Sequence, residues 1–317
     1  MISPTTLLAK LLTGELGEKE LKLIEFTAKE LADRALKSKV LLFFALKIKE
    51  LGLDDLLPEN IKKCAESLEK RLKIHLDLID KLSRIAYSQG FNHVIVKTIK
   101  PYPYVGDDID ILLDAKDYRS FIKSVVNELD FKIEGYGQAE TTLYKYFEGF
   151  EIKIDVHHKL AASTLSYVDT YSVLRTKQRK FACFNEDCIE TYVPSPEYAI
   201  LITSGHAILK ELRVSLADVL DIWHWSKHIS TQMLWKLAKY EGLTETLKVM
   251  REYVRATLMP REVIDLPCRV SVSKLTKCYT EKIANALGKG KYYEVVKMPL
   301  TNIKGYGILL RYIKGHG

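Results

Sequence analysis

Two changes in hydrophobic period limit the folds open to this chain more than any other feature of its sequence. Over residues 4–90 apolar residues recur every three or four positions, as Leu72 and Leu76 do, which is the spacing of amphipathic helices. Over residues 91–193 short runs alternate or stay apolar, which is typical of β-strands. Helical spacing returns from Ser195 onward. The sequence therefore predicts an α+β protein in which N-terminal and C-terminal helical regions flank a small mixed β-sheet.

The changes of period divide the chain into four predicted parts. These are an N-terminal helical region over 1–90, an α/β core over 91–193, a helical region over 194–260 and a basic C-terminal region over 261–317. The third part has a clear start, since Ser195 can cap a helix and Pro196 suits its first position.

The core is predicted in more detail from its alternating runs. Strands are expected at His93–Lys97, Asp108–Asp114, Phe131–Tyr136, Thr142–Phe147 and Phe150–His157. A helix is expected over Ala115–Leu129, and residues 180–193 predict a further short strand pair. Glu148 and Gly149 separate two of the strands, so these two strands should form a hairpin.

Composition favours a soluble, cytoplasmic protein without a membrane segment. The chain is 47% hydrophobic, which is enough for a sizeable core. Its longest uncharged apolar run near the start, Val40–Leu46, falls far short of the roughly 20 residues that a membrane span needs. Met1–Thr6 lacks the basic start of a signal peptide. The five cysteines are scattered, which favours reduced structural thiols over a zinc site.

The net charge of +7 lies entirely in the last part of the chain. Between Arg261 and Gly317 eleven Lys and Arg residues stand against four Asp and Glu residues. Such a region can face a polyanion or can be a solvated surface. Cations and aromatic residues alternate there, as on single-stranded nucleic-acid surfaces, at Lys289, Lys291, Tyr292, Tyr293, Lys297, Lys304, Tyr306, Arg311 and Tyr312. No known RNA-binding signature accompanies them, so nucleic-acid contact and a solvated surface both stay open.

Three aspartates in the core form the strongest chemical pattern. Asp108 and Asp110 are two apart on a predicted strand, so both project from one face while Ile109 points into the core. The alternation before His157 likewise places Asp155 on the face opposite its apolar neighbours. Two acids alone could be solvent-facing residues of an edge strand. Three converging acids repel unless a cation lies between them, and Mg²⁺ and Mn²⁺ prefer oxygen ligands.

The segment around these acids resembles a known family signature. Residues 94–113, VIVKTIKPYPYVGDDIDILL, are similar to the active-site signature of the DNA polymerase beta-like nucleotidyltransferase superfamily. The similarity is greatest to a bacterial and archaeal branch in which the strand ends in a lysine before the loop. Later residues resemble the downstream landmarks of that branch, namely Asp155, Val156, His157, Pro196, Glu197, His206, Asp218 and Asp221. The resemblance covers about residues 91–225.

The resemblance implies a nucleotidyltransferase core and a reaction. Such an enzyme moves a nucleoside monophosphate from an NTP to an acceptor hydroxyl and releases pyrophosphate; the acceptor could be RNA or protein. Asp108 and Asp110 would hold Mg²⁺ or Mn²⁺, and Asp155 would complete the metal site and help to activate the acceptor hydroxyl. The phosphates would be contacted by Lys97, Thr98 and Lys100.

One departure from the family pattern concerns phosphate binding. The superfamily places glycine, followed by serine or glycine, after the first strand, where this chain has Lys97 and Thr98. A β-branched residue cannot replace glycine where φ is positive or where the backbone closely approaches phosphate. The alternative is therefore a catalytically inactive protein of the same fold that acts as a regulatory, antitoxin-like or RNA-binding partner.

Histidines and tryptophans give weaker signals. His157 shares the face of Asp155, so it could ligate metal, orient a substrate, shuttle a proton or simply be tolerated on a polar face. His206 lies in a predicted helix, where a hydrogen-bonded structural histidine is the default. Core packing best explains Trp223, Trp225 and Trp235.

Overall fold

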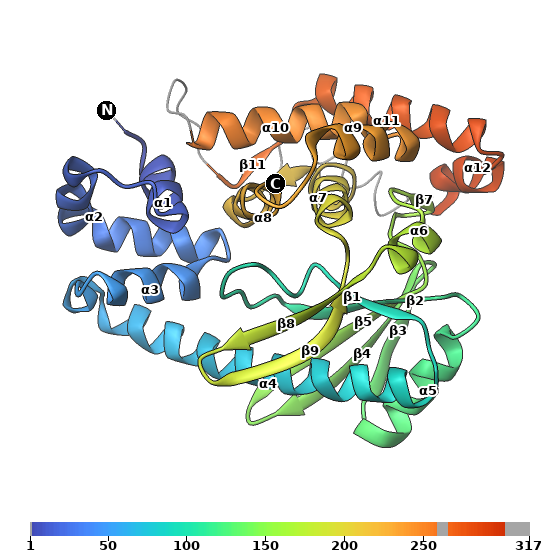
Figure 1. The fold of residues 1–317 in the computed structure, drawn as a ribbon, viewed down its shortest axis with the longest axis horizontal. Helices are drawn as coiled ribbons and strands as arrows, with labels where there is room; N and C mark the ends of the chain where they lie inside the picture. Colours follow the sequence, from blue (N-terminus) through green and yellow to red (C-terminus); the bar gives the residue numbers. More distant parts are fainter. Residues whose placement is uncertain (1, 259–265, 302–317) are drawn as a thin grey trace.

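The structure, a computed structural model, describes residues 2–258 and 266–301 of the chain. Strands occupy the middle of the described chain and helices both of its ends (Figure 1). The predicted α+β class with a small mixed sheet is thus confirmed. Part of the predicted nucleic-acid surface, Lys304, Tyr306, Arg311 and Tyr312, lies outside the described residues.

Twelve helices labelled α1 to α12 belong to the described residues. They are α1 (Pro4–Thr13), α2 (Glu18–Lys37), α3 (Leu41–Glu50), α4 (Glu59–Ser88), α5 (Tyr118–Leu129), α6 (Thr170–Arg175), α7 (Pro196–Gly205), α8 (Leu216–Ser226), α9 (Thr231–Glu241), α10 (Thr244–Leu258), α11 (Val272–Gly288) and α12 (Tyr292–Thr301). The predicted start of α7 is confirmed, because the Tyr198 backbone N–H donates to the Ser195 side chain and Pro196 is the first helical residue. A π-helical turn, His206–Lys210, continues α7.

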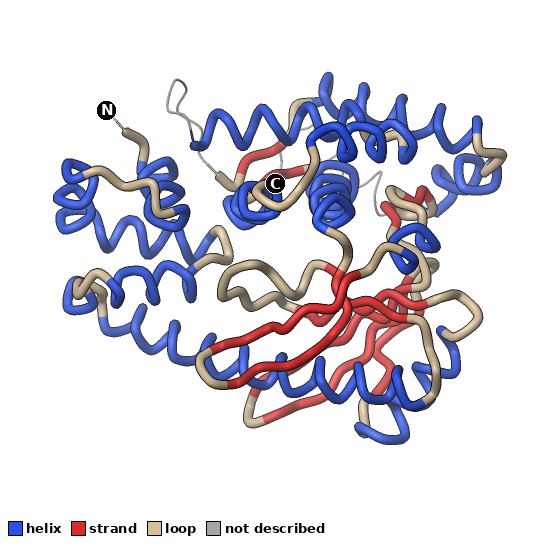
Figure 2. The backbone as a smooth tube through the Cα atoms, in the orientation of Figure 1, coloured by secondary structure: helices blue, strands red, loops and turns tan. Residues whose placement is uncertain are grey.

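The central sheet has five strands in the order β1-β2-β5-β4-β3. Figure 2 shows the strands in red and the surrounding helices in blue. Their bounds are β1 (His93–Val96), β2 (Asp108–Leu113), β3 (Lys132–Tyr136), β4 (Glu140–Phe147) and β5 (Phe150–His157). Only β2 and β5 run parallel within this sheet, so the sheet is mixed, as predicted. The predicted β4–β5 hairpin is present, and its turn residues Glu148 and Gly149 both have positive φ, as a tight hairpin turn requires.

The remaining strands are short or form ribbons outside this sheet. They pair as β6 (Ala161–Ala162) with β7 (Leu165–Ser166), β8 (Gln178–Phe184) with β9 (Asp187–Val193), and β10 (Arg213–Val214) with β11 (Cys268–Arg269). The β8–β9 hairpin confirms the strand pair predicted within residues 180–193.

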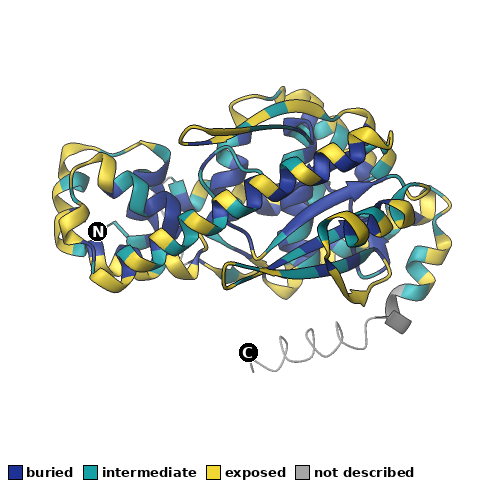
Figure 3. Ribbon diagram, turned by 90° about the horizontal axis from the view of Figure 1, so that it is seen from below, coloured by how far each residue is buried: buried dark blue, intermediate teal, exposed yellow. Residues whose placement is uncertain are grey.

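One face of the sheet is apolar and is covered by α4 and α5. Ile109 and Ile111 of β2 and Ile154 of β5 are fully buried against Phe121 of α5 and Leu82 of α4. In Figure 3 the central strands are coloured as buried, whereas the outer surfaces of the helices are coloured as exposed. Alternation along β2 and β5 therefore leaves their polar residues on the opposite face.

A second apolar core joins the two helical regions. Leu8 of α1 and Phe44 of α3 belong to the same buried cluster as Leu201 of α7, Leu220 of α8 and Met250 of α10. Helices from both ends of the chain thus pack on each other, beside the sheet (Figure 1). Gly205 allows one close approach, because a Cβ there would lie 2.9 Å from a ring carbon of Tyr167.

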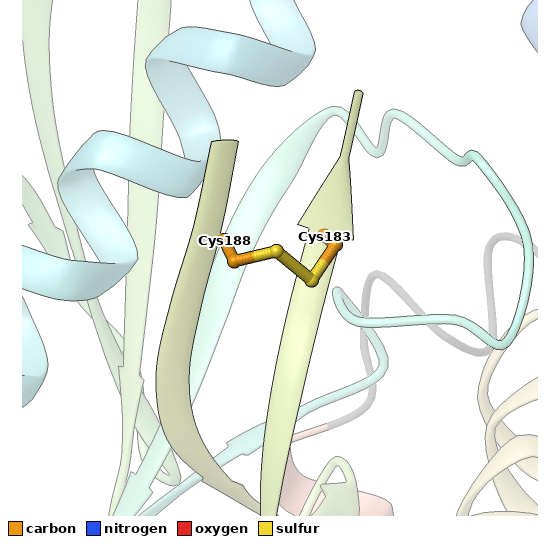
Figure 4. The surroundings of a disulfide bond; sticks show 2 residues. All are labelled: Cys183 and Cys188. Atoms are coloured by element: carbon orange, nitrogen blue, oxygen red, sulfur yellow. A yellow bond between two sulfur atoms is a disulfide. The ribbon is translucent and has the colours of Figure 1, made fainter. Parts of the chain in front are cut away.

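The expectation that all cysteines are reduced is wrong. Cys183 and Cys188 form a disulfide across the β8–β9 hairpin (Figure 4). The two residues are direct partners in the antiparallel register, and their Cα atoms are 4.1 Å apart. Sequence spacing alone did not reveal this pairing, because it depends on the register. Cys64, Cys268 and Cys278 are free.

Among the described residues, no helix combines the length and the apolar character needed to cross a membrane.

The tryptophans lie mainly as predicted, since Trp225 is buried in the helical core and Trp235 packs against it. Trp223 is half-buried on α8, with Lys227 Nζ 3.2 Å from its ring centre.

Truncation of Phe121 to alanine is expected to destabilise the fold strongly. Phe121 of α5 is completely buried in the apolar cluster that α4 and α5 form with the sheet, and emptying such a position costs about 3–5 kcal/mol. Urea denaturation would measure the change in the free energy of unfolding. Phe26→Ala is the matched control, because Phe26 is 85% exposed on α2. Equal losses in the two variants would contradict this account of the core.

Candidate metal centre

The three predicted aspartates lie together on the polar face of the sheet. In the parallel pairing of β2 with β5, Asp110 stands directly opposite Asp155. Asp108 lies two residues before Asp110 and shares its face, and its carboxyl group is within hydrogen-bond reach of Asp155. The geometric prediction made from alternation therefore agrees with the structure.

Asp108 is the member of this group that resists ionisation. Burial and the neighbouring Asp110 and Asp155 carboxylates together raise the pKa of its carboxyl to about 7, although Lys97 opposes this rise. Three carboxylates so close together are costly to ionise in the absence of a compensating cation.

Asp110 is the buried anion of the group, and Lys97 and His157 both meet it. Its Oδ1 atom lies 2.5 Å from Lys97 Nζ and 2.7 Å from His157 Nε2. Burial alone would raise the pKa of Asp110, but Lys97 and His157 outweigh burial and hold it well below its usual range. Asp110 is therefore ionised at neutral pH.

His157 links this anion to a second acid that the sequence did not single out. Its Nδ1 atom lies 3.0 Å from Oε2 of Glu140, which is its direct partner in the β4–β5 register. Burial lowers the pKa of His157, but the hydrogen bonds to Asp110 and Glu140 outweigh this and raise it. The hydrogen bond from His157 lowers the pKa of Glu140 to about 2. With both ring nitrogens engaged by carboxylates, His157 is placed to orient Asp110.

Lys97 reaches Asp110 from an unusual backbone conformation. It follows β1 directly and has a φ of +58°, in the left-handed region that residues other than glycine rarely adopt. Its side chain is only 14% exposed. The residue with positive φ is thus Lys97 and not the β-branched Thr98. The expected conflict between a β-branched side chain and positive φ therefore does not occur.

The Thr98 hydroxyl is engaged within the site. It accepts a hydrogen bond from the Asp110 backbone N–H at 2.8 Å and lies 3.2 Å from the Val96 carbonyl oxygen, to which it donates. These contacts tie the loop after β1 to strand β2. The hydroxyl expected to bind phosphate is therefore already hydrogen-bonded.

Lys100 is also paired. Its Nζ atom lies 2.7 Å from Asp221 Oδ2, and the side chains are 7% and 3% exposed. Thr203 Oγ1 donates to the same oxygen at 2.5 Å. This pair ties the loop after β1 to helices α7 and α8.

A cavity of about 330 Å³ opens over the three aspartates. Its outer wall carries four further cations, which come from the α2–α3 junction and from the segment after α7: Lys37, Lys39, Lys210 and Arg213. Lys39 pairs with Asp107 and Lys210 lies 3.4 Å from Glu140 Oε2. Within the described residues, Lys37 and Arg213 have no acidic partner. Sequence reasoning missed these cations because it looked for phosphate contacts only in the loop after the first strand.

Two residues that resemble downstream landmarks of the family branch, His206 and Asp218, also line this cavity. His206 is part of its lining, and burial lowers the pKa of His206 well below its ordinary value, so the ring is neutral. Asp218 lines it too, but its side chain accepts from the Ser215 N–H at 2.8 Å and so caps α8.

The donor set fits a hard divalent cation. Oxygen or nitrogen atoms of Asp110, Asp155 and His157 lie within 4.8 Å of one another, and Asp108 adds a further carboxyl beside them. Because His157 Nε2 lies 2.7 Å from Asp110 Oδ1 and its Nδ1 lies 3.0 Å from Glu140 Oε2, the carboxylates are the residues available as metal ligands. Carboxylate oxygens suit Mg²⁺ or Mn²⁺.

Comparison with known proteins gives no match to a family model, to a characterised protein or to a solved structure.

Asp108→Asn is expected to change how stability depends on pH. Because folding raises the pKa of Asp108 from 3.8 to about 7, the folded state binds more protons than the unfolded state between these values. Stability is therefore lost as pH rises from about 4 to about 7. Asparagine mimics the protonated acid, so the variant should gain roughly 2–4 kcal/mol over the native chain across this window.

Denaturant unfolding in EDTA at several pH values would measure this difference. Histidines titrate in both proteins, so the comparison isolates Asp108. A difference that stays constant from pH 4.5 to pH 7.5 would show that the carboxyl is ionised throughout.

Lys100→Met is expected to cost about 3–5 kcal/mol, because it leaves Asp221 buried without its cation. The double variant Lys100→Met with Asp221→Leu should recover much of that loss, since no unpaired charge remains. Chemical denaturation of both variants would measure the coupling. A double variant less stable than Lys100→Met would contradict the pairing as the cause.

Proposed function

We propose that the chain is a Mg²⁺- or Mn²⁺-dependent nucleotidyltransferase with a nucleotidyltransferase-like core. It would move a nucleoside monophosphate from an NTP to a hydroxyl group of an RNA, protein or smaller acceptor. The observation that carries this proposal is the meeting of Asp108, Asp110 and Asp155 on one face of the sheet, beneath a cavity with cations on its outer wall.

In the proposed reaction, one bond to the α-phosphorus forms and one bond to it breaks. The acceptor oxygen bonds to this phosphorus, the bond to the β-phosphate oxygen breaks, and pyrophosphate leaves. The hydroxyl proton passes to a carboxylate, for which Asp155 is placed. One oxygen of Asp155 accepts from Thr142 Oγ1 at 2.6 Å, which fixes the orientation of the carboxylate.

The metal would be held by Asp108, Asp110 and Asp155. A bound divalent cation neutralises phosphate charge and lowers the pKa of an attacking hydroxyl. Lys97 and His157 would keep Asp110 ionised and oriented for this role, because both contact its Oδ1 atom.

The phosphate contacts are assigned differently from the sequence expectation. Lys97 and Lys100 each pair with an aspartate, and the Thr98 hydroxyl is hydrogen-bonded within the site. Lys37 and Arg213 face the same cavity without acidic partners in the described part of the chain. We therefore assign the triphosphate to the outer wall of the cavity.

A second candidate is a nucleotide-binding protein that does not catalyse transfer and acts on a partner. The commitment of Lys97 and Thr98 to internal contacts favours it, since the loop after β1 then offers no free phosphate cradle. This candidate requires nucleotide binding without pyrophosphate release.

Label transfer from each α-labelled NTP tests the two candidates. The native chain with Mg²⁺ or Mn²⁺ should label an acceptor in RNA, protein or small-molecule fractions. Asp108→Ala combined with Asp110→Ala should lower the rate by about a hundredfold or more, because metal stabilisation is worth several kcal/mol. Pyrophosphate release would be followed in parallel.

Asp114→Ala is the matched control for this experiment. Asp114 immediately follows the opposite end of β2, where its side chain accepts from the Lys116 N–H, so the same chemical change should leave transfer intact. Nucleotide binding with no label in any fraction would favour the non-catalytic candidate. Equal transfer by the native chain and the double variant would exclude these aspartates from the reaction.

A further inference from the structure

We propose that the Lys97 ammonium group takes the place of a second metal ion, so that this centre binds a single divalent cation. The proposal rests on the proposed function in so far as it takes the three aspartates as metal ligands. It states how many divalent cations the centre binds, and the contacts of Asp110 support it.

One oxygen of Asp110 is already used. Lys97 Nζ lies 2.5 Å from Oδ1 and His157 Nε2 lies 2.7 Å from the same atom. In two-metal centres the ions lie about 3.5–4 Å apart, and a carboxylate that bridges them gives one oxygen to each ion. Asp110 has only Oδ2 left, so it cannot bridge while Lys97 stays in place.

Lys97 is held where it is. Its side chain is 14% exposed, and its backbone has a φ of +58°. Such a conformation persists in a residue other than glycine only when the surroundings fix it. His157 cannot turn away either, because its Nδ1 atom lies 3.0 Å from Glu140 Oε2.

Titration with Mn²⁺, followed by electron paramagnetic resonance of the free ion, counts bound ions without any catalytic turnover. The native full-length chain should bind one Mn²⁺. Lys97→Met should bind two, and its first ion should bind roughly tenfold more tightly or better, because a nearby positive charge is lost. Lys97→Gly should behave alike while removing the strain of positive φ, so it serves if the methionine variant folds poorly.

Lys39→Met is the matched control. Lys39 also has a φ of +58°, lines the same cavity and pairs with an aspartate, Asp107. Its removal takes one positive charge from the cavity without touching Asp110. This variant should bind one Mn²⁺ with nearly native affinity.

The outcomes separate this proposal from the proposed function. Two ions or none in the native chain would overturn it, and so would Lys97 variants with native stoichiometry and affinity. Label transfer together with two bound ions would support the proposed transferase activity and contradict the proposed role of Lys97. One bound ion without any transfer would support the role of Lys97 and remove the transferase.

Discussion

The rest of the site depends on the need to pair one buried carboxylate, that of Asp110. A buried charge is tolerated only when it is paired and hydrogen-bonded, and Lys97, His157 and the Thr98 hydroxyl meet this need. Each partner brings its own requirement. Lys97 must hold a left-handed backbone conformation, and His157 must be held from behind by Glu140. One anion thus organises three strands and the loop after β1.

The two faces of the sheet explain why this anion lies beneath the cavity. Ile109 and Ile154 bury one face under α4 and α5, and strict alternation leaves Asp110 and Asp155 on the other. The parallel pairing of β2 with β5 sets these two acids side by side.

Alternation made it possible to predict which side chains share a face of the sheet. The register between the strands could not be predicted from the sequence. Asp108, Asp110 and Asp155 could be placed from the sequence because period two fixes which side chains share a face. Glu140 could not, because its role follows from standing opposite His157 in the β4–β5 register, and β4 was expected to begin only at Thr142. The disulfide between Cys183 and Cys188 likewise follows from the strand register. The strand bounds that shifted by one or two residues also depend on this register.

The departure at Lys97 and Thr98 takes on a different meaning once the contacts are known. These residues do not form a free phosphate-binding loop. Instead, Lys97 pairs with the Asp110 carboxylate and Thr98 accepts a hydrogen bond from the Asp110 backbone N–H. Cations for a substrate must then come from elsewhere, and Lys37 and Arg213 lie in segments far apart in the sequence. One apolar core that contains Leu8, Phe44 and Met250 joins the helices of both regions. Placement of these cations about the cavity thus depends on helix packing, and so the helical regions that flank the sheet are as necessary to the site as its strands.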